Sequence, residues 1–151
     1  MSNKKQVCYG GAAVAGMVYC GIDVSATRLD VAVQREGVDG FRRRQFANTG
    51  TGHRQLLAWL QQLGAGARVV LEASGVYSLD VALALDEAGV EVAVLNPRKA
   101  SDFARSLNRS KTDKADAEAL SEHSRRMEFV RWRRPSREAL ELRALAGIWP
   151  R

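Results

Sequence analysis

The chain has few of the residues that cross-link small proteins or bind metals through sulfur and nitrogen. Its 151 residues include only two cysteines, Cys8 and Cys20, and two histidines, His53 and His123. The cysteines do not have the spacing of metal ligands, and nothing in their placement indicates a disulfide framework, which fits a reducing compartment. The histidines are isolated in the sequence, so we expect them at the surface rather than in a metal site.

Long apolar runs are also missing from the sequence. No stretch is long enough to span a bilayer. Lys4 and Lys5 precede a mildly apolar, glycine-rich stretch from Gly10 to Gly16, which is too polar for a signal peptide. We therefore expect a cytoplasmic protein without membrane association, in which residues 1–16 form a flexible extension and Met17 opens the folded domain.

The positive charge of the chain is concentrated in one segment. Apolar residues make up 46% of the sequence, enough for one domain with a core, and the formal net charge is +6. Between Pro97 and Arg137 there are 12 Lys/Arg and 6 Asp/Glu, whereas the rest of the chain has 11 of each. Such a segment is typical of a protein that binds a polyanion, most simply nucleic acid. A solvated basic helix face would have the same composition, and charge alone does not distinguish the two.

The hydrophobic pattern predicts a run of strands followed by alternating strands and helices. Val18–Val24 is almost wholly apolar, as in a strand buried on both faces, whereas Leu29–Gln34 alternates, as in a half-buried strand. The short link between them predicts a hairpin. Further strands are expected at Phe41–Ala47, Arg68–Ala73 and Val90–Leu95, and helices at 56–63 after an N-cap at Thr51, at Leu79–Ala88, from Pro97 to about Leu107 and from about Thr112 to Arg126.

This order of elements predicts an α/β fold of the ribonuclease H-like type. Three strands joined by tight turns form an antiparallel meander, and the later strands add in parallel through right-handed crossovers. The expected structure is a mixed five-stranded sheet of order 3-2-1-4-5, flanked by helices. In open sheets of this kind, ligands bind beyond the carboxyl ends of the parallel strands.

Four acidic residues fall where this topology would bring them to one site. Asp23 and Glu72 lie near the carboxyl ends of two expected parallel strands. Asp113 and Asp116 are three residues apart at the start of an expected helix, which would place them on one helical face. Carboxylates held together repel one another unless a cation lies between them. Four of them can hold two Mg²⁺ (or Mn²⁺) ions that flank a scissile phosphate.

Each acid also has an ordinary structural explanation. The helical pair could be favoured by the macrodipole of a solvated helix N-terminus. The first strand acid could cap the end of its strand, and Glu72 could form a salt bridge with Arg68 or Arg98. Two further acids, Asp30 and Asp102, are expected to be solvated. These separate explanations are weaker for all four acids together than for any one of them.

Four motifs together resemble one known family. They are GIDVSATRLDVAV from Gly21, LEASGVY from Leu71, LNPRKASDFARS from Leu95 and SKTDKADAEALSE from Ser110. They resemble the N-terminal domain of the insertion-sequence-110 family of transposases, a domain also found in pilin-gene invertases. The resemblance extends from about Met17 to Arg143, which is most of the chain.

The resemblance implies a RuvC-like transposase and DNA recombinase domain over residues 17–130, with Mg²⁺ (or Mn²⁺) used for DNA strand cleavage and exchange. Members of the family also have a helical coiled-coil region and a C-terminal domain with a nucleophilic serine. Residues 131–151 would then be a basic linker and the start of a truncated helical region. The implied partners are DNA, a structured guide RNA and, in the full-length protein, further copies of the chain. The implied DEDD metal site consists of Asp23, Glu72, Asp113 and Asp116.

Two other functions stay open at the level of sequence. Without the serine domain, the chain could be a catalytically silent nucleic-acid-binding fragment. It could also be an actin-like or sugar-kinase-like ATPase domain, whose first phosphate loop resembles the motif from Gly21, although no second glycine-rich phosphate loop is present. In the nucleic-acid readings, the basic residues expected to contact phosphates are Arg98, Lys99, Arg105, Arg109, Lys111 and Lys114.

Overall fold

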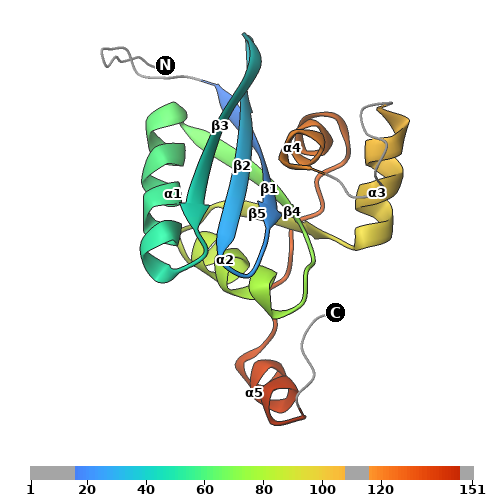
Figure 1. Cartoon of the computed structure of the whole chain (residues 1–151). Helices are drawn as coiled ribbons and strands as arrows, with labels where there is room; N and C mark the ends of the chain where they lie inside the picture. Colours follow the sequence, from blue (N-terminus) through green and yellow to red (C-terminus); the bar gives the residue numbers. More distant parts are fainter. Residues whose placement is uncertain (1–15, 108–115, 147–151) are drawn as a thin grey trace.

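The computed structural model describes residues 16–107 and 116–146, with side chains as far as Leu142. It has one sheet with helices on both faces (Figure 1). The strands are β1 (Met17–Val24), β2 (Arg28–Arg35), β3 (Val38–Ala47), β4 (Gly66–Glu72) and β5 (Glu91–Leu95). The helices are α1 (Gly50–Leu63), α2 (Val76–Glu87), α3 (Pro97–Ser106), α4 (Ala117–Arg126) and α5 (Arg137–Ala146).

The sheet order is β3-β2-β1-β4-β5, which is the ribonuclease H-like order, so the predicted topology is confirmed. β1 is central and pairs with β2 in antiparallel and with β4 in parallel orientation. β3 is antiparallel to β2, and β5 is parallel to β4. The tight turns before β2 and β3 force reversals, whereas α1 and α2 carry the chain back to the start of the next parallel strand.

One face of the sheet is buried under α1 and α2. Alternate residues of β1 and β2 point to this face, where Ile22 and Val31 meet Leu56 and Trp59 of α1. The segment after α4 reaches the same core along the edge of β5, where the Trp132 N–H donates to the carbonyl of the second residue of β5, a valine, at 2.6 Å. Helix α5 lies beyond the sheet (Figure 1). None of the described helices is long and apolar enough to cross a membrane.

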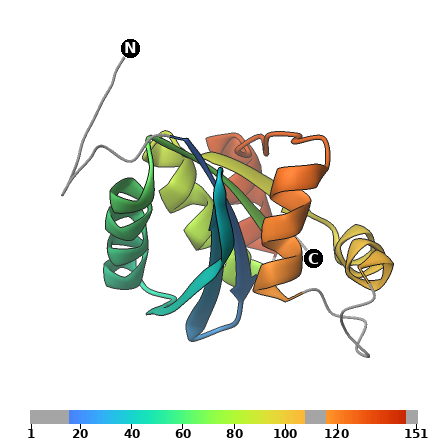
Figure 2. The same cartoon turned by 90° about the horizontal axis from the view of Figure 1, so that it is seen from above.

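The other face of the sheet is covered by α3 and α4, and small side chains bring these helices close. Ala100 and Ala104 of α3 and Ala119 of α4 are all buried in this second core. Seen from above, α4 and α1 stand on opposite sides of the sheet (Figure 2). The two cores use alternate residues of the same strands, as the period of 2 in a strand requires.

Helix α4 crosses β1 at Gly21, and no larger residue fits there. A Cβ on Gly21 would lie 2.1 Å from the Ala117 carbonyl oxygen and 2.3 Å from the Ser121 nitrogen. The Ser121 hydroxyl donates to the Tyr19 carbonyl at 2.7 Å, and the Ser124 hydroxyl donates to the β4 backbone at 2.9 Å. Glycine therefore permits the approach, and the two serines satisfy strand carbonyls that the helix covers.

The helix starts agree with the sequence prediction in one case and differ in another. Helix α3 starts at Pro97, as expected, and Asn96 caps it, because its side chain accepts from the Lys99 N–H at 2.8 Å. Helix α1 starts earlier than expected. Its N-cap is Thr49, whose hydroxyl accepts from the Gly52 N–H, so the prediction of Thr51 was wrong by two residues.

Candidate active site

The ends of β1 and β4 bring Asp23 and Glu72 side by side. Ile22 pairs with Leu71 in the parallel ladder, and both point into the α1/α2 core. The next residue on each strand therefore points to the opposite face, where α4 lies. Both acidic side chains are half-buried. Two carboxylates from neighbouring strand ends thus open onto one side of the sheet.

A third acid, Asp30, stands directly opposite Asp23. The two residues are register partners in the antiparallel pair of β1 and β2. Asp30 is half-buried and lies 3.5 Å from the Arg28 guanidinium. The expectation that Asp30 is simply solvated was therefore wrong. The sequence contained a signal for this pair, because a hairpin centred on the predicted turn matches residue 23 with residue 30.

Asp116 is the N-cap of α4 rather than a residue within it. Its backbone is extended (φ −89°, ψ 177°), and its carboxylate accepts from the Ala119 N–H at 2.8 Å. The prediction of a helix running through Asp116 from about Thr112 was therefore wrong, because the described helix begins at Ala117. Asp113 lies outside the described residues. The ordinary explanation from sequence was the macrodipole of a helix N-terminus, and for Asp116 the structure adds a capping hydrogen bond.

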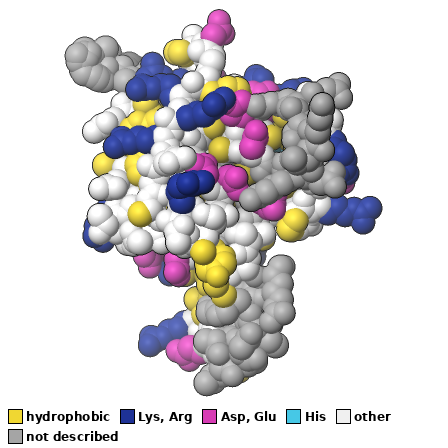
Figure 3. Space-filling model, in the orientation of Figure 1, with side chains coloured by type: hydrophobic (Ala, Val, Ile, Leu, Met, Phe, Trp, Pro, Cys, Tyr) yellow, Lys and Arg dark blue, Asp and Glu magenta, His cyan; other side chains and the backbone are white. Residues whose placement is uncertain are grey.

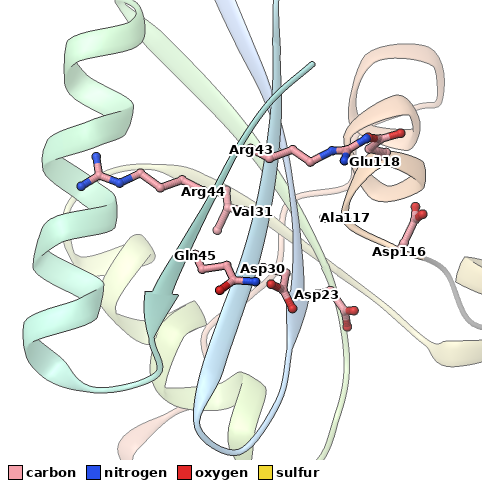
Figure 4. A pocket seen from close by; sticks show the side chains of 9 residues that line it. All are labelled: Asp23, Asp30, Val31, Arg43, Arg44, Gln45, Asp116, Ala117 and Glu118. Atoms are coloured by element: carbon pink, nitrogen blue, oxygen red, sulfur yellow. The ribbon is translucent and has the colours of Figure 1, made fainter. Parts of the chain in front are cut away.

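Asp23, Asp30 and Asp116 line one pocket between the sheet and α4, with a volume of about 530 Å³. Figure 4 shows the Asp23 and Asp30 carboxylates near each other on the sheet, and Asp116 to one side of them at the start of α4. On the face seen in Figure 3, acidic side chains gather near the centre with basic side chains beside them. Glu72 does not line this pocket. The pocket wall consists of Asp23, Asp30, Val31, Arg43, Arg44, Gln45, Asp116, Ala117 and Glu118.

The basic residues of this wall come from β3. The Arg43 guanidinium forms an ion pair with Glu118, whose side chain is only 11% exposed, and so links the sheet edge to the first turn of α4. Arg44 points the other way (Figure 4) and lies over the Phe46 ring at 5.1 Å. The sequence analysis missed Arg43 and Glu118, because two residues 75 positions apart carry no local pattern of contact.

The basic residues expected at the site lie elsewhere, as far as the structure describes them. Arg98, Lys99 and Arg105 are exposed on α3, and none of them lines the acidic pocket. Arg105 forms an ion pair with Asp102 on the same helix. The other three expected phosphate contacts, Arg109, Lys111 and Lys114, lie outside the described residues.

The histidines do not behave as the sequence suggested. His53 is only 7% exposed, so the expectation of a surface residue was wrong, and burial lowers its pKa below the ordinary 6.5. His123 is half-buried edge-on against Phe103, and burial followed by the charge of Lys99 lowers its pKa as well. Burial raises the pKa of the Cys20 thiol, which therefore remains protonated and unreactive.

The donor chemistry of the site fits a hard divalent cation. Carboxylate oxygens are the ligands that Mg²⁺ and Mn²⁺ take from proteins, and the acidic residues come from three different elements. Within residues 16–107 and 116–146, no three His, Cys, Asp or Glu residues are grouped closely enough to hold a metal ion. The carboxylates are thus of the right chemical type for such an ion. One of the four expected ligands, Asp113, lies outside this part of the chain.

Comparison with known proteins places the chain in a family. The family model named for the DEDD transposases of insertion sequence 110, with the description "Transposase", matches residues 20–148. The chain belongs to this transposase family. A solved structure of Thermus thermophilus RuvC is similar at 20% identity and a TM-score of 0.43, over 89% of this chain and 99% of that one. No curated protein matches the chain.

Membership confirms the resemblance found in the sequence motifs. The matched region contains all the acidic candidates and all the basic candidates. A transposase acts on DNA, which agrees with the basic segment found in the sequence.

Proposed function

We propose that this transposase domain cleaves or exchanges DNA strands with Mg²⁺ (or Mn²⁺) bound by four carboxylates. The proposed ligands are Asp23, Glu72, Asp113 and Asp116. The observation that carries the proposal is the convergence of Asp23, from the central strand, and Asp116, from the start of α4, on one pocket at the carboxyl ends of the parallel strands. Ligands of open α/β sheets bind at this place.

In this mechanism the chain supplies position and charge. Asp23 and Glu72 project from strands fixed by the central ladder, so their spacing is set by the sheet. The bound metal would stabilise the attacking and leaving oxygens of a phosphodiester. The pocket wall carries the Arg43 guanidinium, which offsets part of the acidic charge that a phosphate would meet.

The basic residues from Arg98 to Lys114 are proposed to hold the nucleic acid. Arg98, Lys99 and Arg105, with Arg109, Lys111 and Lys114, would contact phosphates of DNA and of a structured guide RNA. Replacing one true phosphate contact reduces the slope of log affinity against log salt by about 1. An Arg98→Ala, Lys99→Ala variant should show a slope reduced by about 2, and Arg54→Ala on the α1 side should not.

Thermal melts test the metal site directly. A metal that binds only the folded protein must raise its stability by mass action. We expect millimolar Mg²⁺ or Mn²⁺ to raise the Tm relative to EDTA, and Asp23→Asn to abolish the rise. Asp39→Asn, an exposed acid on β3, should keep it. Superimposed melts of the wild type in EDTA and in metal would contradict the proposal.

One observation favours a second candidate, a nucleic-acid-binding domain without catalysis of its own. Asp116 already has a structural role as a helix cap, and capping by itself explains an aspartate at that position. A nuclease assay on branched DNA with Mn²⁺ separates the two functions. Cleavage that Asp23→Asn removes supports the metal-dependent nuclease. Salt-dependent binding without cleavage supports the second candidate.

A further inference from the structure

The side chain of Asn48 joins the two loops that follow the acidic strand ends. Asn48 lies between β3 and α1 and is half-buried. Its Nδ2 donates to the Ser25 carbonyl at 2.9 Å and to the Tyr77 carbonyl at 3.1 Å. Its backbone N–H donates to the Thr27 carbonyl at 3.0 Å. One residue therefore holds the turn after β1 and the first turn of α2 together.

The orientation of the Asn48 amide follows from its partners. Only the NH₂ group can serve two carbonyl oxygens, so the amide oxygen faces His53, whose Nε2 lies 2.8 Å away. His53 must therefore carry a proton on Nε2 and donate it. Because His53 is buried in α1, it holds the amide from the side opposite the two loops. The side chain thus uses both its donors and its acceptor.

The two segments that Asn48 joins follow the strands that carry the acids. Ser25 follows Asp23 by two residues, and Tyr77 follows Glu72 by five. The parallel ladder between β1 and β4 ends at the Ile22–Leu71 pair, one residue before the acids. Beyond that pair, the Asn48 amide bridges the two chains where they leave the sheet.

We infer that Asn48 is a positioning residue that sets the separation of the Asp23 and Glu72 carboxylates. This inference rests on the proposed metal site and adds a residue to it that binds no metal. Hydrogen bonds behind the ligands of a metal site commonly contribute 10- to 100-fold in affinity, because they hold the ligands in place. A purely structural role for Asn48 would lower stability and leave the affinity of the folded protein for metal unchanged.

The test is a titration of the full chain with Mn²⁺ well below the melting temperature, in which electron paramagnetic resonance measures the free and bound metal. Asn48→Asp keeps the oxygen toward His53 but places an oxygen against two carbonyls, and Asn48→Ala removes every side-chain bond. We expect both to raise the Kd for Mn²⁺ about tenfold or more. The matched control is Thr49→Ala, which removes the neighbouring N-cap of α1 and lowers stability without touching either loop.

The outcomes separate this inference from the proposed function. If the wild type binds Mn²⁺ and the Asn48 variants bind it with the same Kd, the positioning role is wrong and the metal site stands. If the wild type binds no Mn²⁺, the proposed function fails, and the positioning role with it. If neither Asn48 variant folds, His53→Ala takes their place because it removes the group that orients the amide. A wild-type Kd in that variant overturns the inference.

Discussion

Replacing Gly21 by alanine should push α4 away from the sheet. A Cβ at this position would lie 2.1 Å from the Ala117 carbonyl oxygen, and real Cβ contacts essentially never come under 3.0 Å, so the backbones must separate by about 0.9 Å. Overpacking of this kind costs about 1–3 kcal/mol. The same shift stretches the hydrogen bonds of Ser121 and Ser124 to the sheet, each worth about 1 kcal/mol.

We therefore expect Gly21→Ala to lower the free energy of unfolding by about 2–4 kcal/mol. For a chain of this size that corresponds to a fall in Tm of about 6–12 °C. Urea unfolding followed by circular dichroism measures the free energy directly. The loss would be a large part of a total stability that is typically about 5–15 kcal/mol.

Gly66→Ala is the matched control on a neighbouring strand. A Cβ at Gly66 would meet only the Met17 side chain at 3.7 Å, an ordinary contact. This variant should be neutral or stabilised by less than about 1 kcal/mol, because alanine restricts the unfolded chain. If Gly21→Ala is as stable as Gly66→Ala, the close crossing of α4 over β1 is wrong. The position of Asp116 across the pocket would then lose its support as well.

Three further predictions concern buried polar groups. Ser121→Ala should cost about 1–3 kcal/mol in chemical unfolding, since Ser121 is 0% exposed and its loss leaves a covered strand carbonyl without its donor. The free energy of unfolding should be highest above pH 6.5 and should fall as the pH drops below it. His53 and His123 have lowered pKa values in the folded protein, so the unfolded chain binds protons at these residues more readily. Replacing both histidines by glutamine should flatten this part of a series of unfolding measurements against pH. Arg43→Ala should destabilise the protein more than Glu118→Gln does in parallel melts, by about 1 kcal/mol or more. Arg43→Ala takes an ion-pair partner from a buried carboxylate, whereas Glu118→Gln takes one from an arginine that is exposed to water.

The topology of the sheet was predictable because it depends on local signals. Apolar periodicity marked all five strands to within a few residues, and the lengths of the links between them decided which pairs are antiparallel. The start of α4 was not predictable in the same way. A helix pattern through Thr112 looked continuous in sequence, yet Asp116 adopts an extended backbone and caps the helix. Helix boundaries depend on such caps, which one aspartate among several can provide.

The candidate site was predictable only in part, for a related reason. Asp23 and Glu72 could be placed from strand order alone, since strand ends meet at one edge. The ion pair of Arg43 with Glu118 depends on how α4 docks on the sheet. The bonds of Asn48 depend on three segments that meet only in the folded chain. Contacts of this kind have no periodicity, so the sequence shows the residues without showing that they meet.

Two different contacts position the acids around a common reference, Asp23 on the central strand. The crossing at Gly21 sets how far the start of α4, and therefore Asp116, stands from β1. The Asn48 bridge sets how the chain leaving β1 lies against the chain leaving β4, and therefore the place of Glu72. Neither contact includes a carboxylate, so loosening either one changes the geometry of the ligands while their number and charge stay the same. Under the proposed function, loosening either contact should then lower the affinity for metal although the net charge of the pocket does not change, because Mg²⁺ demands near-ideal ligand geometry.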